Sequence, residues 1–81
     1  MTNDRDAIRR TLDDIFREVF DDASVSATEG LGRDQFPSWD SLGHIRLIGA
    51  TEEAFGVTFT IEQIERMTSV EQIIDQILAT R

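Results

Sequence analysis

Apolar residues in the first quarter of the sequence recur with the period of an α-helix. Six of them lie at offsets of 0, 4, 7, 8, 11 and 12, on one face of a helix of about four to five turns: Ile8, Leu12, Ile15, Phe16, Val19 and Phe20. A second stripe lies near the end of the chain at offsets of 0, 3, 4, 7 and 8: Val70, Ile73, Ile74, Ile77 and Leu78. Each stripe must be buried against another element, so the pattern favours helices packed on helices.

Charged and capping residues mark the ends of the first helix. Asp4 and Asp6 suit the positive end of the helix dipole, and Thr2 or Asn3 can accept the capping hydrogen bond. The acidic pair at positions 21 and 22 fits a helix C-terminus poorly. We therefore expect the first helix to stop there.

The helical period is lost between residues 23 and 40. This stretch contains two glycines and the only proline of the chain, which favours a long ordered loop. A loop of this length in a small domain needs side chains that hold it in place. We expect Leu31, Phe36 and Trp39 to pack over the helices as apolar plugs, in preference to contacting a ligand.

A second long helix is predicted from Ser41 to Phe55. Asp40 can cap its start, and Gly56 is well placed as the left-handed residue that ends it. Four apolar residues form its expected inner face: Leu42, Ile45, Ile48 and Phe55.

Two pairs with capping-box spacing follow. Thr60 and Gln63 start a short third helix that runs to about residue 66, and Thr68 and Glu71 start a last helix that reaches about residue 79. Four helices leave no residues for a sheet. The sequence thus predicts one domain over residues 1–81, an all-α, small four-helix bundle with a long loop between its first two helices.

Composition excludes several classes of function. A chain of 81 residues builds an elaborate active site of its own only with difficulty, and the absence of cysteine removes disulfides, thiolate zinc sites and a thiol nucleophile. The single histidine and the scattered carboxylates match neither zinc nor EF-hand spacing, so we expect no metal.

Charge and hydropathy indicate the partners and the compartment. Eight arginines against 16 acidic residues give a formal net charge of −8, which repels nucleic acid and anionic membranes and favours basic protein surfaces. The N-terminal stretch has no apolar run long enough for a signal peptide or a membrane helix. We expect a cytoplasmic monomer whose melting temperature rises with salt or divalent cations.

Ser41 raises the main question about function. A hydrolase nucleophile needs a base and an oxyanion hole, but W-D-S-L-G lacks the first glycine of a nucleophile elbow, and we expect His44 on the surface. A serine at a helix N-terminus also suits attachment of a phosphate-linked group, because free backbone amides and the helix dipole favour an anion. These residues alone still favour a capping role, since serine is common at such positions.

Three motifs in register carry a resemblance. They are D-S-L at 40–42, E-E-A-F-G-V at 52–57 and T-S-V-E-Q-I-I-D-Q-I at 68–77. Together they resemble the acyl carrier protein family, closely from residue 36 to about residue 78 and by pattern over the first helix.

The resemblance implies that Ser41 carries 4′-phosphopantetheine, transferred from coenzyme A by a phosphopantetheinyl transferase. The thiol of this arm holds acyl groups as thioesters, and the protein itself catalyses nothing. Asp40 and Leu42 would belong to the motif that the transferase recognises. Acyl-loading enzymes and acyl-transferring or condensing enzymes would dock on the helix that follows Ser41, which offers Leu42, Ile45, Arg46, Glu52 and Glu53 as partner-binding residues.

The sequence departs from the family at two positions. Gly43 replaces the usual acidic residue after D-S-L, and Arg46 replaces an acidic residue on the exposed face. We hypothesise that Arg46 excludes partners built for an all-acidic surface, so that this is a dedicated carrier of a specialised polyketide, fatty-acid-like or other secondary pathway. Equally, Arg46 could simply pair with Glu52 or Glu53.

The cargo and the class of function stay open at this point. Aminoacyl carriers usually have histidine before the serine, where this chain has Asp40, so an acyl carrier is favoured over an aminoacyl or peptidyl carrier. Short cargo could lie beside Ile45, Ile64 and Met67, although plain core packing is favoured for each. In the competing class the chain is an acidic helical docking module, and Ser41 is only a cap.

Overall fold

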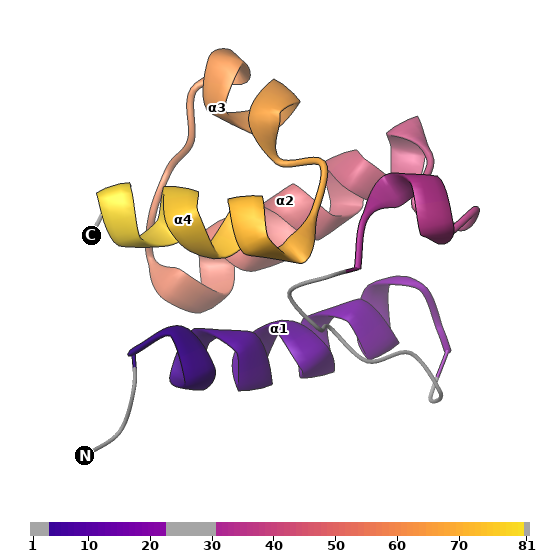
Figure 1. The fold of residues 1–81 in the computed structure, drawn as a ribbon, viewed down its shortest axis with the longest axis horizontal. Coiled ribbons are helices and arrows are strands. Elements are labelled where there is room, and N and C mark those ends of the chain that lie inside the picture. The colour runs from indigo at the N-terminus through magenta and orange to yellow at the C-terminus, as the bar shows by residue number, and fades with distance from the viewer. Residues whose placement is uncertain (1–3, 23–30, 81) are drawn as a thin grey trace.

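The computed structural model describes residues 4–22 and 31–80, and four α-helices account for most of them (Figure 1). They are α1 (Asp4–Val19), α2 (Ser41–Phe55), α3 (Ile61–Arg66) and α4 (Val70–Thr80), and a 3₁₀ turn, η1 (Arg33–Gln35), precedes α2. Within the described ranges no strand occurs, only an isolated bridge between Gly32 and Ser69. The predicted all-α bundle is confirmed, whereas the 3₁₀ turn was not predicted.

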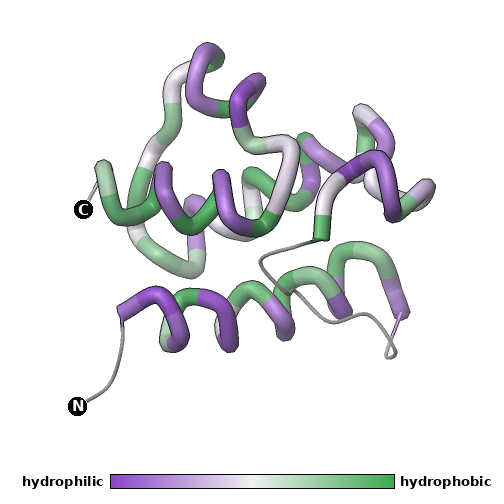
Figure 2. The backbone as a smooth tube through the Cα atoms, viewed as in Figure 1, coloured by the Kyte–Doolittle hydropathy of each residue, from purple (hydrophilic) through white to green (hydrophobic). Residues whose placement is uncertain are grey.

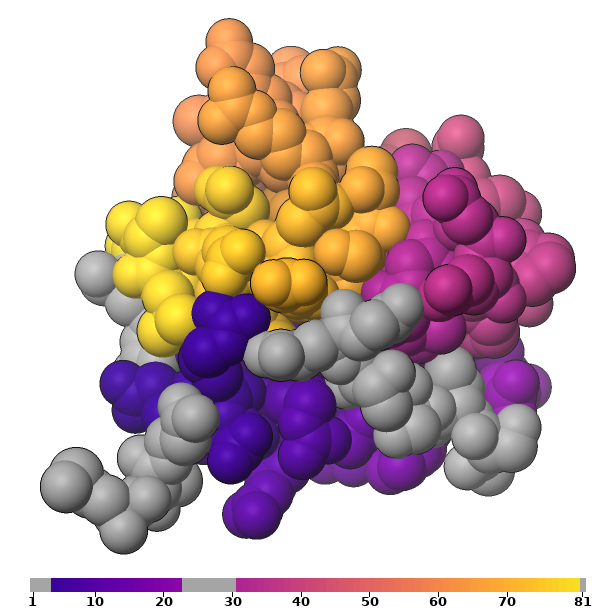
Figure 3. Space-filling model, in the orientation of Figure 1, coloured from indigo at the N-terminus to yellow at the C-terminus, as the bar shows by residue number. Residues whose placement is uncertain are grey.

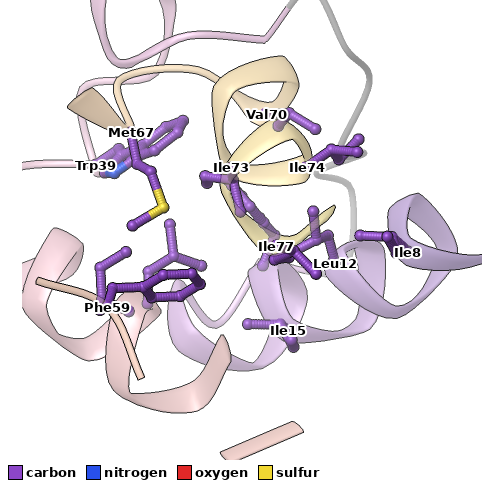
Figure 4. Close-up of a cluster of buried hydrophobic side chains, with 13 residues drawn as sticks. Ile8, Leu12, Ile15, Trp39, Phe59, Met67, Val70, Ile73, Ile74 and Ile77 are labelled. Atoms are coloured by element: carbon purple, nitrogen blue, oxygen red, sulfur yellow. The ribbon is translucent and has the colours of Figure 1, made fainter. Parts of the chain in front are cut away.

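The helices surround one core. α1 packs against α2 and α4, and α3 stands out from the body of the molecule (Figures 1 and 3). Hydrophobic and hydrophilic residues alternate along α1 and α4, as helices with one apolar face require (Figure 2). The core, drawn in Figure 4, consists of Ile8, Leu12, Ile15, Phe16, Trp39, Leu47, Ile48, Phe59, Met67, Val70, Ile73, Ile74 and Ile77.

Left-handed residues end α1 and α2. Asp21 has a φ of 49°, and the N–H of Asp22 donates to the carbonyl of Arg17 over 3.1 Å, which closes α1 where the acidic pair predicted it. Gly56 has a φ of 64° and ends α2 as expected. Thr2 and Asn3, the expected caps of α1, lie outside the described residues.

The capping box of α3 is confirmed, and that of α4 is wrong by one residue. Thr60 and Gln63 exchange the two predicted hydrogen bonds. At α4, however, Ser69 Oγ accepts from the N–H of Gln72. The register shifts because the N–H of Val70 donates to the carbonyl of Leu31 over 2.9 Å, which makes Val70 the first residue of the helix.

The same hydrogen bonds join the loop before α2 to the turn before α4. Besides the bond between Val70 and Leu31, the N–H of Arg33 donates to the carbonyl of Thr68 over 3.0 Å. These two backbone bonds flank the bridge between Gly32 and Ser69. We call this short backbone pairing the seam.

The expected inner face of α2 is partly wrong. Leu42 and Ile45 are 65% and 67% exposed, and the buried residues of α2 are Gly43, His44, Leu47, Ile48 and Thr51. Both sets of residues fit a helical period. The buried set prevails because it brings a glycine to a close contact with α1 and supplies His44 with partners for both of its ring nitrogens.

The expected apolar plugs of the loop are confirmed. Trp39 is 2% exposed, and Leu31 and Phe36 pack partly buried against the core. The Trp39 ring meets the Phe16 ring edge to face with centroids 5.2 Å apart, and Phe36 meets Phe20 in the same way at 5.0 Å. This aromatic packing holds the last residues of the loop to α1.

Candidate functional site

Ser41 is the first residue of α2, and it is exposed. The cap of the helix is Asp40: its Oδ1 accepts from the N–H of Gly43 over 2.8 Å, and its carbonyl accepts from the N–H of His44 over 2.8 Å. Within residues 4–22 and 31–80 the Ser41 hydroxyl makes no hydrogen bond. The helix therefore does not use Ser41 as its cap, and the hydroxyl remains available for chemistry.

The loop holds Ser41 in place through Trp39. The N–H of Trp39 donates to the carbonyl of Phe36 over 2.9 Å, and Arg33 Nε donates to the Trp39 carbonyl over 3.2 Å. Since the Trp39 ring is buried, the backbone two residues before Ser41 is fixed on both sides.

His44 is buried at 6% exposure, so the expected surface position is wrong. The indole N–H of Trp39 donates to its Nδ1 over 2.9 Å, and its Nε2 lies 2.8 Å from the carbonyl of Ile64. Because the indole is only a donor and the carbonyl only an acceptor, the ring is neutral with its proton on Nε2.

Burial lowers the pKa of His44 below its ordinary value of 6.5. The nearby Arg33 charge lowers it further, whereas the hydrogen bond to Ile64 opposes the shift. With both nitrogens engaged, His44 is not a base for Ser41. A hydrolase dyad is thereby excluded for the described residues.

Gly43 explains one departure from the family pattern. A Cβ at this position would lie 2.7 Å from the Phe20 ring and 2.9 Å from the carbonyl of Ser38. An acidic side chain does not fit there while Phe20 fills that space. The Phe20–Gly43 contact, which brings α1 against the start of α2, was missed from the sequence because the partners are far apart in the chain.

The expected partner-binding residues do not form one uniform surface. Leu42 and Ile45 are exposed, as is Ile61 on α3 at 75%. Glu52 is half-buried, and its Oε2 accepts from the N–H of Phe59 over 2.8 Å. Met67 is buried in the core, where packing was the favoured interpretation.

Arg46 and Glu53 are exposed and line a groove between α1 and α2. The groove has a volume of about 450 Å³, and its other lining residues are Ile15, Glu18, Val19, Ala50 and Ala54. No ion pair involving Arg46 occurs in the described part of the chain. The simpler alternative, in which Arg46 pairs with Glu52 or Glu53, is therefore not supported.

Comparison with solved structures identifies the fold. The solution NMR structure of a holo acyl carrier protein from Geobacter metallireducens matches with a TM-score of 0.82 and 29% sequence identity, covering 90% of this chain and 84% of that chain. The chain has the acyl carrier protein fold. Scans against protein-family models and curated proteins give no match.

The acyl carrier protein fold is that of a carrier and not of a catalytic domain. It confirms the resemblance inferred from the three sequence motifs. Among the described helices none is long and apolar enough to cross a membrane. No group of three or more potential metal ligands occurs among the same residues.

Proposed function

We propose that this chain is an acyl carrier protein that bears 4′-phosphopantetheine on Ser41. The observation that carries the proposal is the exposed Ser41 hydroxyl, which Asp40 relieves of any capping role, in a fold shared with a structure described as holo acyl carrier protein. When bound, the group supplies a thiol that holds cargo as a thioester, which a chain without cysteine otherwise lacks.

The residues around Ser41 fit a phosphate-linked group. The Asp40 side chain accepts from the N–H of Gly43, and the Asp40 carbonyl accepts from the N–H of His44. The N–H groups of the first two residues of α2, Ser41 and Leu42, therefore stay open to an anion at the positive end of the helix dipole. The exposed Leu42 lies beside Ser41 and offers an apolar contact to a transferase. Asp40 completes the motif that the transferase would recognise.

The partners that this function requires are a phosphopantetheinyl transferase and enzymes that load, transfer or condense acyl groups. Leu42 and Ile45 supply exposed apolar contacts, and Glu53 supplies an exposed charge. Glu52 contributes less, because the backbone of Phe59 already engages it. The chain acts as a cytoplasmic monomer and catalyses nothing itself.

Arg46 favours a dedicated carrier in a specialised biosynthetic pathway. Its guanidinium is exposed and makes no ion pair within the described residues, so a partner with a basic patch at this point would meet like charge. A partner with an acidic or neutral residue there is preferred. The cargo is acyl in type, with an aminoacyl or peptidyl carrier as the alternative.

Mass spectrometry tests the attachment. The purified chain is incubated with coenzyme A and a broad-specificity phosphopantetheinyl transferase, and we expect one phosphopantetheinyl addition that maps to Ser41. Ser41→Ala should abolish the addition, whereas Ser38→Ala, at an exposed serine of the same loop, should leave it unchanged. An unmodified wild-type chain, with the transferase active on a known carrier, would instead favour the docking module.

A further inference from the structure

One imidazole connects three segments around Ser41. Trp39 ends the loop, His44 lies in the first turn of α2 and Ile64 lies on α3. The indole N–H to Nδ1 distance is 2.9 Å, and Nε2 lies 2.8 Å from the Ile64 carbonyl. We call this chain of two hydrogen bonds the His44 clasp.

Among the described residues, the clasp is the one buried side-chain hydrogen-bond chain that joins α2 both to the loop, at Trp39, and to α3, at Ile64. Buried Thr51 bonds only within its own helix, to the carbonyl of Leu47. Loss of the clasp would remove the hydrogen bonds that join the Trp39 side chain and the α3 backbone to α2, and the apolar contacts that remain set direction less strictly than hydrogen bonds do.

The geometry works only with a neutral ring. A proton on Nδ1 would turn the acceptor of the indole N–H into a second donor, so the Trp39 bond would be lost. The buried cation would then lie beside the N–H of Trp39 with no acceptor for its new proton. Protonation therefore both removes a hydrogen bond and introduces an unpaired buried charge.

We propose that His44 is a positioning residue for Ser41: its neutral form fixes the end of the loop and α3 against the start of α2, and its protonation releases them. The consequence for attachment rests on the proposed function of Ser41, whereas the clasp itself does not. Trp39 and His44 are the only tryptophan and the only histidine of the chain, so each can be followed without ambiguity.

Among the charged groups around the clasp, Arg33 is the one that acts on the His44 ring. Arg33 on the loop side disfavours a second cation, as does the positive end of the α2 dipole. Asp40, on the helix of His44 itself, is engaged as the cap. On α3 the charged neighbours of Ile64 are Glu65 and Arg66, both exposed to solvent, and on the α1 side the Phe16 ring, which packs on Trp39, brings no charge.

The pH range of the release follows from these surroundings. Burial lowers the pKa of His44 in the folded chain below its ordinary value of 6.5, which the unfolded chain retains. The unfolded chain therefore binds the proton first as pH falls. The clasp stabilises the fold fully above pH 6.5, and this contribution is lost as the pH falls from 6.5 toward the lowered pKa.

NMR and fluorescence of the full chain test the clasp directly. We expect ¹⁵N spectra to show the Nε2–H tautomer at neutral pH and a His44 titration below 6.5. The Trp39 indole N–H resonance and the emission maximum should change with the same midpoint. A His44 titration that leaves the indole resonance unchanged, or an Nδ1–H tautomer at neutral pH, would overturn the proposal.

Two variants separate the clasp from general acid unfolding. His44→Gln keeps one acceptor and one donor but has no titrating group, so the Trp39 transition should disappear. Trp39→Phe removes the donor to Nδ1, so the His44 titration should move to higher pH. If His44→Gln still shows the transition, another group drives it and the proposal fails.

The rate of Ser41 modification tests the consequence for attachment. Since the transferase has its own pH dependence, the useful quantity is the ratio of the wild-type rate to that of His44→Gln. This ratio should fall several-fold as the pH drops through the His44 titration, and a constant ratio would refute the positioning role. If Ser41 accepts no group at any pH, the proposed function fails, but the NMR and fluorescence measurements still test whether the clasp exists and opens on protonation of His44.

Discussion

At the start of α2, Asp40 caps the helix and the neighbouring Ser41 is left free for attachment. Asp40 binds the backbone amide of Gly43 and so stabilises the helix, while Ser41 is exposed and takes no part in capping. A serine cap would have its hydroxyl engaged by the backbone and less open to a modifying enzyme. The separation of the two tasks is what makes attachment at Ser41 compatible with an intact helix.

This division predicts opposite effects of two alanine substitutions. Asp40→Ala should lower the free energy of unfolding by about 1 kcal/mol, because it removes an N-cap. Ser41→Ala should leave stability within about 0.5 kcal/mol of wild type, as expected for an exposed position. Urea denaturation followed by circular dichroism measures both. A clear loss in Ser41→Ala with none in Asp40→Ala would show that Ser41 is the cap.

At the scale of the helices, α2 connects the functional residues to the rest of the bundle. Asp40 fixes its start, and the left-handed Gly56 fixes its end. Gly49 lies within the helix at an exposed position where an added Cβ would meet nothing within 4 Å. Gly56 is therefore required by the backbone conformation at the end of α2, whereas nothing around Gly49 requires a glycine.

The difference predicts that one glycine-to-alanine change stabilises the chain and the other destabilises it. Gly49→Ala should raise the free energy of unfolding by about 0.5 to 1 kcal/mol, because alanine has the higher helix propensity. Gly56→Ala should lower it by about 1 to 2 kcal/mol, the cost of a side chain in the left-handed region. Thermal melts of the two variants beside wild type decide this, and shifts of the same sign would contradict it.

Features that depend on adjacent residues were predictable from the sequence, whereas features that depend on residues far apart in the chain were not. The bounds of α2 and the cap at Asp40 were predictable, because capping and termination depend on adjacent residues. The burial of His44 was not, since it depends on Trp39 from the loop and Ile64 from α3. The helical pattern placed Leu42 on the inner face because two faces were possible and only packing selects one, whereas the family resemblance had Leu42 available to partners, as its 65% exposure allows.

Across the whole molecule, acidic residues exceed basic ones by two to one, and the formal net charge is −8. Some of the charges are paired: Arg5 joins α1 to Asp75 of α4 at 2.7 Å, and Arg9 lies 3.7 Å from Asp13. Such surface pairs stabilise only weakly. The remaining like charges repel one another and favour the expanded, unfolded chain.

Salt should therefore stabilise the protein. We expect the melting temperature to rise with ionic strength, in sodium chloride and in magnesium chloride alike, because counterions screen repulsion within the acidic surface. Differential scanning calorimetry measures the shift, with an uncharged osmolyte at matched osmolality as the control. A melting temperature that does not change with salt would show that charge repulsion does not measurably destabilise the folded chain.

The seam also has a consequence for the order in which the chain folds. Its hydrogen bonds join residues 31 and 70 and residues 33 and 68, so they close a segment of about 40 residues at an entropic cost of about 3 kcal/mol. Two backbone hydrogen bonds contribute about 1 kcal/mol each and do not offset that cost alone. We therefore expect the seam to form late, after α2 and α3 have packed on the core, so that a chain still being synthesised would lack the finished loop that presents Ser41.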